Sequence, residues 1–124
     1  MAQTITVILL EDDRPLRELM AEGLRDAAFT VVETVTGAEA LDALRSVAPP
    51  HVLVADRALA PGNSGPNGFQ VAETARDLYP GLGVIYISGT HLALKHRSLG
   101  ARERALYKPF ALHQLVGLLQ ELTD

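Results

Sequence analysis

The chain has 124 residues and a mass of 13.3 kDa, enough for one domain with a sizeable core and too little for two. Hydrophobic residues make up 48% and charged residues 21%, as in ordinary globular proteins and unlike disordered chains. The net charge of −4 and the scattered basic residues argue against direct nucleic-acid binding. We therefore treat residues 1–124 as one folded domain.

Cysteine is absent, which excludes disulfide bonds, thiolate nucleophiles and cysteine-based zinc sites. No apolar run is long enough to span a membrane, and the N-terminus lacks the basic start of a secretory signal. The histidines at positions 51, 91, 96 and 113 are spread too widely to predict a metal site or a catalytic base. We expect a cytoplasmic protein that does not contact a membrane.

The first predicted strand runs from Ile5 to Leu10 and stops at Glu11-Asp12-Asp13, as a strand buried on both faces does. Asp13 is positioned to cap an amphipathic helix, and Pro15 suits its first turn. The apolar residues of this helix recur at three- and four-residue spacing: Leu16, Leu19, Met20, Gly23, Leu24 and Ala27.

A second strand and helix follow, over Phe29–Val35 and Ala38–Val47, with Pro49-Pro50 ending the helix. The third strand, Val52–Ala55, again ends at an acid, Asp56. The next twelve positions, 57–68, are rich in glycine, proline and asparagine, and they predict a long loop. A third helix over 69–79 and a fourth strand over 84–87 continue the alternation.

The segment from His91 to Arg104 shows little periodicity, and its leucines suggest a short helix that stops near Gly100. Ala105–Tyr107 predicts a short fifth strand, and leucines over 112–122 mark a final amphipathic helix. Strands and helices thus alternate along the whole chain. Because parallel strands need crossover connections, this alternation predicts an α/β fold with a parallel sheet and helices on both faces.

Polar residues follow four of the predicted strands, and the carboxyl ends of parallel strands meet at one edge of a sheet. These residues are Glu11, Asp12, Asp56, Ser88 and Lys108. Clustered carboxylates repel one another unless a cation is bound, and Mg²⁺ prefers oxygen ligands and pairs with phosphate. We therefore predict that Glu11 and Asp12 hold Mg²⁺ while Asp56 is a nucleophile that forms an acyl phosphate. Lys108 and Ser88 would contact the phosphoryl oxygens.

Four motifs in this order resemble the receiver domain of two-component response regulators, and the resemblance covers essentially the whole chain. The motifs are Leu9-Leu10-Glu11-Asp12-Asp13, Val54-Ala55-Asp56, Ile87-Ser88-Gly89 and Tyr107-Lys108-Pro109-Phe110. The resemblance implies a flavodoxin-like, doubly wound, five-stranded parallel sheet in the order 2-1-3-4-5 with helices on both faces. Residues 1–124 would form a single receiver (response regulatory) domain.

The resemblance also implies that Asp56 accepts a phosphoryl group from a histidine kinase or histidine phosphotransfer protein. Mg²⁺ would be bound by Asp56, directly by Asp12, largely through water by Glu11, and by the backbone carbonyl of Ala58. Turnover of an external substrate is not expected. The only reactions implied are the domain's own aspartyl phosphorylation and autodephosphorylation.

The sequence departs from the family pattern in three places. Ala105 stands where the family usually has an aromatic switch residue, three positions before Lys108. We expect Tyr107 to replace this aromatic residue only if the register of the strand shifts, because adjacent strand residues point to opposite faces. The loop through positions 62–67 is also longer than usual, and the segment between Ser88 and Lys108 is slightly shorter.

The leading hypothesis is a stand-alone phosphoacceptor switch without an output domain, which binds an unidentified protein target. The alternative is a pseudo-receiver that acts as a phosphorylation-independent interaction module, as the missing aromatic would suggest. A hydrolase with an aspartyl-phosphate intermediate is disfavoured, because Ala58 cannot supply the second acid that this class uses. Residues Leu115, Val116, Leu118, Leu119 and Leu122 form a stripe that is mostly core but broad enough for a homodimer contact.

Overall fold

A computed structural model describes residues 4–46, 49–56, 65–89 and 99–123. Its core is a five-stranded sheet in which every neighbouring pair is parallel and the strand order is β2-β1-β3-β4-β5. The predicted fold class and strand order are therefore confirmed. The strands are β1 (Thr6–Leu10), β2 (Thr30–Thr34), β3 (Val52–Asp56), β4 (Gly83–Ser88) and β5 (Glu103–Tyr107).

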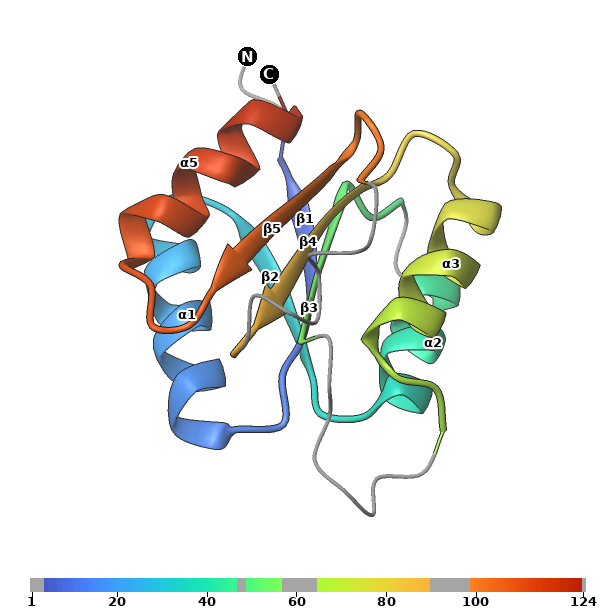
Figure 1. Ribbon diagram of the computed structural model, residues 1–124, viewed down its shortest axis with the longest axis horizontal. Coiled ribbons are helices and arrows are strands. Elements are labelled where there is room, and N and C mark those ends of the chain that lie inside the picture. Colours follow the sequence, from blue (N-terminus) through green and yellow to red (C-terminus); the bar gives the residue numbers. More distant parts are fainter. Residues whose placement is uncertain (1–3, 47–48, 57–64, 90–98, 124) are drawn as a thin grey trace.

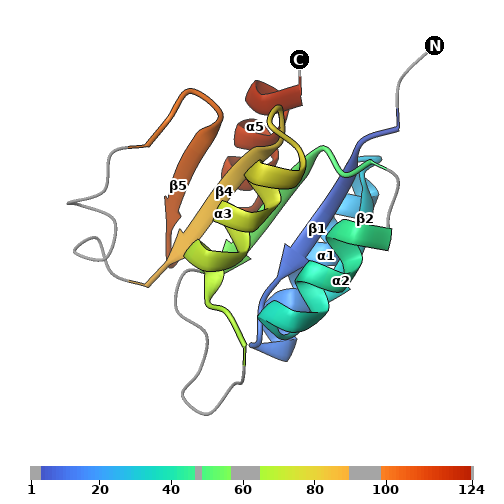
Figure 2. The same cartoon turned by 90° about the vertical axis from the view of Figure 1, so that its right-hand side faces the viewer.

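Helices cover both faces of the sheet (Figures 1 and 2). In the described part of the chain they are α1 (Arg14–Asp26), α2 (Gly37–Ser46), α3 (Gly68–Leu78) and α5 (Leu112–Thr123). Successive strand residues point to opposite faces, so each strand contributes to two separate cores. Val7 and Leu9 of β1 pack with α1 and α5, whereas Ile8 and Leu10 pack with α2 and α3.

Local sequence signals account for two of the helix starts. The Asp13 side chain accepts a hydrogen bond from the Leu16 backbone N at 3.2 Å, as predicted for the cap of α1. At α3, Asn67 and Gln70 form a reciprocal capping box with distances of 2.9 and 3.0 Å. No helix of the described residues is both long and apolar enough to cross a membrane.

The start of α2 is fixed by a close approach between two backbones. A Cβ atom added to Gly37 would collide with the carbonyl oxygen of Pro66, which precedes α3. Only glycine leaves room for this approach, which places the backbone at Pro66 directly against the start of α2. The far end of the connection that follows Asp56 is therefore fixed against the body of the domain.

The predicted fifth strand, Ala105–Tyr107, starts two residues too late, because Glu103 and Arg104 also belong to β5. Glu103 pairs with Val84 of β4, and its side chain is only 6% exposed. A strand that starts with charged residues gives no apolar pattern there, so the sequence did not indicate that Glu103 and Arg104 belong to the strand. The predicted short helix between His91 and Gly100 falls mostly on residues 91–98, which lie outside the described residues.

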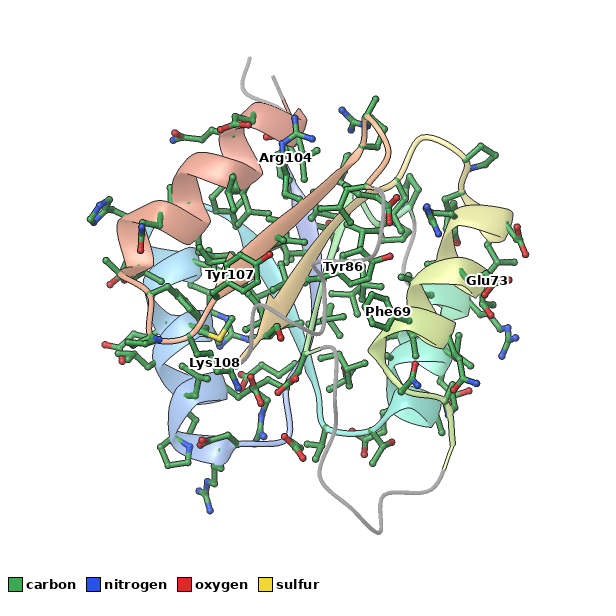
Figure 3. The ribbon with its side chains drawn as sticks, viewed as in Figure 1. Phe69, Glu73, Tyr86, Arg104, Tyr107 and Lys108 are labelled. Carbon is green, nitrogen blue, oxygen red and sulfur yellow. The ribbon has the colours of Figure 1, made fainter. Side chains whose placement is uncertain are left out.

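Two polar partners make the burial of Glu103 tolerable. The Tyr86 hydroxyl donates to Glu103 Oε2 at 2.7 Å, and Arg76 Nη1 of α3 lies 3.0 Å from Glu103 Oε1. Phe69 of α3 packs on the Tyr86 ring (Figure 3), and the two ring centroids are 4.9 Å apart. Because a buried charge needs such partners, this cluster ties β4, β5 and α3 together.

The leucine stripe of α5 is mainly core, as predicted. Leu115, Leu119 and Leu122 are at most 2% exposed, and Val116 and Leu118 are half-buried against the same cluster. The homodimer contact stays a prediction.

Helix α1 ends in a left-handed residue that is not glycine. Ala28 has φ 73°, its N donates to Arg25 O at 3.0 Å, and Phe29 N donates to Leu24 O at 3.0 Å. This pair of bonds is the Schellman pattern, in which glycine is the usual left-handed residue because it has no Cβ. Alanine at this position is therefore strained.

We expect Ala28→Gly to raise the free energy of unfolding by about 1 kcal/mol, because the relief of left-handed strain exceeds the added chain entropy. Urea denaturation measures the change. Ala27→Gly is the matched control, since Ala27 has an ordinary φ of −86° and gains nothing from glycine. Equal stabilisation by both variants, or a loss with Ala28→Gly, would contradict this account.

Candidate functional site

All of the predicted site residues that the structure describes stand at one edge of the sheet. Asp56 and Ser88 are the last residues of β3 and β4, and Glu11 and Lys108 directly follow β1 and β5. Three of these side chains are buried: Glu11 is 1%, Ser88 2% and Asp56 6% exposed. Ala58, the predicted backbone ligand, lies outside the described residues.

Three carboxylates converge at this edge. One oxygen from each of Glu11, Asp12 and Asp56 lies within 4.8 Å of the others. The Lys108 ammonium is the counter-charge: its Nζ is 3.1 Å from Asp56 Oδ2 and 3.3 Å from Glu11 Oε1. Since one ammonium faces three carboxylates, this group of four side chains retains a net negative charge that favours a cation.

Glu11 is held by its backbone and by one side-chain oxygen. Its N donates to Thr34 O of β2 at 3.2 Å, and its Oε2 accepts from Asp13 N at 3.1 Å. The other oxygen, Oε1, is buried and lies 3.3 Å from the Lys108 ammonium, its ion-pair partner, but it accepts no hydrogen bond from the described residues. Because Glu11 and Asp56 share this one ammonium, a further cation close to Oε1 would stabilise the buried charge.

The electrostatics of the site follow from burial and crowding. Burial raises the pKa of Glu11 from 4.5 to about 7, and the neighbouring Asp56 carboxylate adds to the rise. For Lys108, burial works against the charged ammonium, but attraction by Glu11 and Asp56 outweighs it and raises the pKa. Lys108 therefore remains charged, whereas negative charge on both Glu11 and Asp56 is unfavourable.

The donor set suits a hard divalent cation. Carboxylate oxygens are the ligands that Mg²⁺ prefers, and it is usually bound by one or two carboxylates with water completing the octahedron. Glu11 Oε1 is a buried oxygen that shares the Lys108 ammonium with Asp56, and the cluster supplies the negative charge. The residues present therefore fit Mg²⁺.

The ends of β4 and β5 are joined directly beside this cluster. Lys108 N donates to Ser88 O at 2.8 Å, and Ser88 pairs with Tyr107 across the two strands. Ala105 and Tyr107 both pack against the core on the α2 and α3 side. From the sequence, Tyr107 is expected to replace an aromatic residue at position 105 only if the strand register shifts. This interpretation is wrong, because residues 105 and 107 are two positions apart and therefore lie on the same strand face.

Arg17 is a site residue that the sequence analysis missed. Its Nη1 donates to the backbone carbonyl of Glu11 at 3.1 Å, and its side chain is 13% exposed. A basic residue close to a helix start opposes the helix dipole, and this was the signal available in the sequence. The signal is weak, because Arg14 at the same helix start is exposed and pairs only with Glu18 among the described residues.

An apolar pocket of about 430 Å³ adjoins the acidic cluster. It is lined by Asp13, Pro15, Leu16, Leu19, Lys108, Pro109 and Phe110. Leu19 of α1, which lines the pocket, is 61% exposed. The pocket thus offers an apolar contact surface that begins at the site lysine.

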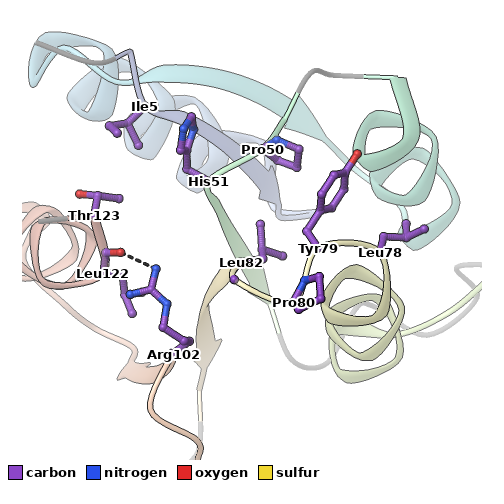
Figure 4. A pocket seen from close by; sticks show the side chains of 11 residues that line it. Ile5, Pro50, His51, Leu78, Tyr79, Pro80, Leu82, Arg102, Leu122 and Thr123 are labelled. Atoms are coloured by element: carbon purple, nitrogen blue, oxygen red, sulfur yellow. Dashed lines mark hydrogen bonds between the residues drawn. The ribbon is translucent and has the colours of Figure 1, made fainter.

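A second pocket, of about 500 Å³, lies at the opposite edge of the sheet (Figure 4). Ile5 and His51 line it just before β1 and β3, and Arg102 donates to Leu122 O at 2.6 Å beside it. None of the five site residues at the acidic edge lines this pocket.

The raised pKa of Glu11 has a testable effect on stability. Between about pH 4.5 and 7 the folded protein holds a proton that the unfolded chain has lost, so stability falls as pH rises. We expect Glu11→Gln, without added divalent cation, to gain about 3 kcal/mol over the wild type at pH 8 and little at pH 4.5. Urea midpoints across this range measure the difference.

Glu22→Gln on the exposed side of α1 is the control, because it removes a carboxylate that is not part of the acidic cluster. A Glu11→Gln gain that is the same at both pH values would show that Glu11 titrates normally.

Comparison with known proteins places the chain among signalling domains. Residues 7–120 match the family model for the response regulator receiver domain. The sensor kinase CckA of Brucella abortus (strain 2308) is 28% identical over 121 residues, which cover 96% of this chain but 12% of that protein. The chain therefore spans a small part of this curated relative.

Two solved structures show the same fold. A response regulator receiver protein from Sinorhizobium medicae WSM419 has a TM-score of 0.86 and 30% identity, with 97% of this chain and 94% of that chain covered. The receiver domain of the hybrid histidine kinase CckA has a TM-score of 0.78 and 23% identity, with 96% and 99% covered. The family match over most of the chain leads to one conclusion: this protein belongs to the response regulator receiver domain family.

Proposed function

We propose that the domain is a phosphoacceptor switch in which Asp56 receives a phosphoryl group. The observation that carries this proposal is the contact of Asp56 Oδ2 with Lys108 Nζ at 3.1 Å inside a cluster of three carboxylates. Asp56 ends a fully buried strand, so its backbone is held firmly while its carboxylate faces the site. A fixed carboxylate beside a cation is suited to nucleophilic attack on phosphorus.

In the transfer step, an Asp56 carboxylate oxygen forms a bond to the phosphorus of a phosphohistidine, and the P–N bond breaks with its electron pair going to the imidazole nitrogen. Lys108 neutralises one of the phosphoryl oxygens, and the buried Ser88 hydroxyl is positioned at the end of β4 to donate to another. Water later attacks the phosphorus, the bond to the Asp56 oxygen breaks, and inorganic phosphate leaves while the Asp56 carboxylate is regenerated.

Mg²⁺ would be held by Asp12 and Asp56 directly and by Glu11 largely through water, with the Ala58 carbonyl as a further ligand. When bound, it offsets the charge on the carboxylates and on the phosphoryl oxygens. The three acids would hold it in place, and the buried Glu11 Oε1, which pairs with Lys108 at 3.3 Å, would gain a second cation nearby. We expect no turnover of an external substrate.

The phosphoryl donor would be a histidine kinase or a histidine phosphotransfer protein of a two-component system or phosphorelay. Such a donor must bring its histidine to Asp56 and therefore cover the surface around Lys108. The apolar pocket that Leu19 and Phe110 line begins at this lysine and supplies the contact area. The new negative charge on Asp56 would then draw Lys108 and Ser88 toward it and change the surface offered to a target.

We expect wild-type protein incubated with Mg²⁺ and acetyl phosphate to gain one phosphoryl group by intact mass. Asp56→Asn should gain none, because an amide is not a nucleophile at phosphorus. Asp42→Asn, an exposed acid on α2, is the control and should be labelled like the wild type. Labelling of Asp56→Asn would overturn the assignment, and no labelling of the wild type would favour the phosphorylation-independent interaction module.

We expect Leu19→Glu to slow transfer from a phosphorylated histidine phosphotransfer protein about tenfold, because it puts a charge into an apolar contact. Labelling by acetyl phosphate, which needs no docking, should be unchanged. The control is Leu78→Glu, which alters an exposed leucine of α3 that lines the pocket at the other edge of the sheet. Equal rates for the wild type and both variants would place the donor elsewhere.

A further inference from the structure

The two backbone polar groups of Glu11 are both tied to the end of β2. On one side, Glu11 N donates to the Thr34 carbonyl at 3.2 Å. On the other side, the Glu11 carbonyl accepts from Arg17 Nη1 at 3.1 Å, and Arg17 Nε lies 3.5 Å from Glu33 Oε1. Glu33 and Thr34 are neighbours on β2, so one strand end fixes both polar groups of the Glu11 backbone.

This arrangement matters because the Glu11 carbonyl that Arg17 holds belongs to the peptide that joins Glu11 to Asp12. The orientation of its plane sets the direction in which both side chains leave the backbone. Arg17 spans from the carbonyl to Glu33, and Glu33 is in turn held by Arg25 Nη1 at 3.0 Å. The Arg17 side chain is 13% exposed and the Glu33 side chain 30% exposed, so the Arg17 end of this ion pair is the better shielded from water.

We infer that Arg17 is a positioning residue for the metal site: its guanidinium fixes the Glu11–Asp12 peptide and thereby pre-orients the two carboxylates that bind the divalent cation. The inference rests on the proposed function, because it needs a cation at this cluster. Arg17 itself touches neither the cation ligands' carboxylates nor the reacting atoms in the described contacts. It acts through the backbone of Glu11.

The chemistry of arginine explains why this residue type is needed. The guanidinium fork donates in two directions at once, to the Glu11 carbonyl through Nη1 and toward Glu33 through Nε. A lysine ammonium is a single point of charge on a flexible stem and cannot span the same two acceptors with fixed geometry. Arg17→Lys therefore keeps the charge and removes the fork.

The test is the Mg²⁺ dissociation constant, measured by calorimetric titration of the unphosphorylated protein with MgCl₂. We expect Arg17→Gln and Arg17→Lys to weaken Mg²⁺ binding about tenfold, as loss of a group that orients metal ligands does. Arg14→Gln is the matched control: Arg14 is in the same turn of α1, is 78% exposed, and pairs with Glu18 instead. It should bind Mg²⁺ like the wild type.

A second readout separates positioning from simple stabilisation. The amide nitrogen of Asp12 belongs to the peptide whose carbonyl Arg17 holds, so its NMR chemical shift should move in Arg17→Gln and stay in Arg14→Gln. Wild-type affinity in Arg17→Gln, or full affinity in Arg17→Lys, would overturn the inference. Should Arg17→Gln fail to fold, Glu33→Gln removes the charge that pairs with Arg17 and should weaken Mg²⁺ binding several-fold. Unchanged Mg²⁺ affinity in Glu33→Gln would also overturn the inference.

Asp12→Asn keeps this test distinct from the test of the proposed site. Loss of Mg²⁺ binding in Asp12→Asn with wild-type affinity in Arg17→Gln would overturn only the positioning role. Equal Mg²⁺ binding by Asp12→Asn and the wild type would instead overturn the proposed metal site, and the inference with it.

Discussion

The crowding of three carboxylates at one sheet edge is the constraint on which the rest of this domain depends. Parallel strands bring Glu11, Asp12 and Asp56 together, and Lys108 is the ammonium that faces them. Like charges at this distance stay together only because a rigid, buried sheet holds their backbones. The two apolar cores provide that rigidity, so the fold supplies the free energy that maintains an unfavourable group of charges.

Much of this arrangement was predictable because its signals are local. Apolar runs that stop at acids mark the strand ends, and Asp13 marks a helix start. What could not be predicted depends on partners far away in the sequence. Glu103 gives no strand signal, because Tyr86 and Arg76 make its burial tolerable. The bond from Arg17 to Glu11 needs the turn geometry, and no spacing rule specifies it.

The position that usually carries an aromatic residue has a different environment in this domain. Ala105 pairs with Tyr86, whose ring lies in the interior against Phe69 and whose hydroxyl is bonded to Glu103. An aromatic residue is thus present one strand away, in β4, but it is fully buried and fixed by a hydrogen bond. Tyr107 is half-buried on the same strand face as Ala105, at the level of Ser88.

The close approach of Gly37 to Pro66 has a consequence for how the chain tolerates change. Asp56 is fixed by the sheet, and Pro66 is fixed against the start of α2, so the connection between them begins and ends on rigid supports. Closing a flexible connection costs free energy that grows only with the logarithm of its length, about 0.6 kcal/mol for each doubling. Insertions between these two supports should therefore cost little stability, and residues next to the acidic edge can vary in number while the frame that holds the charges stays unchanged.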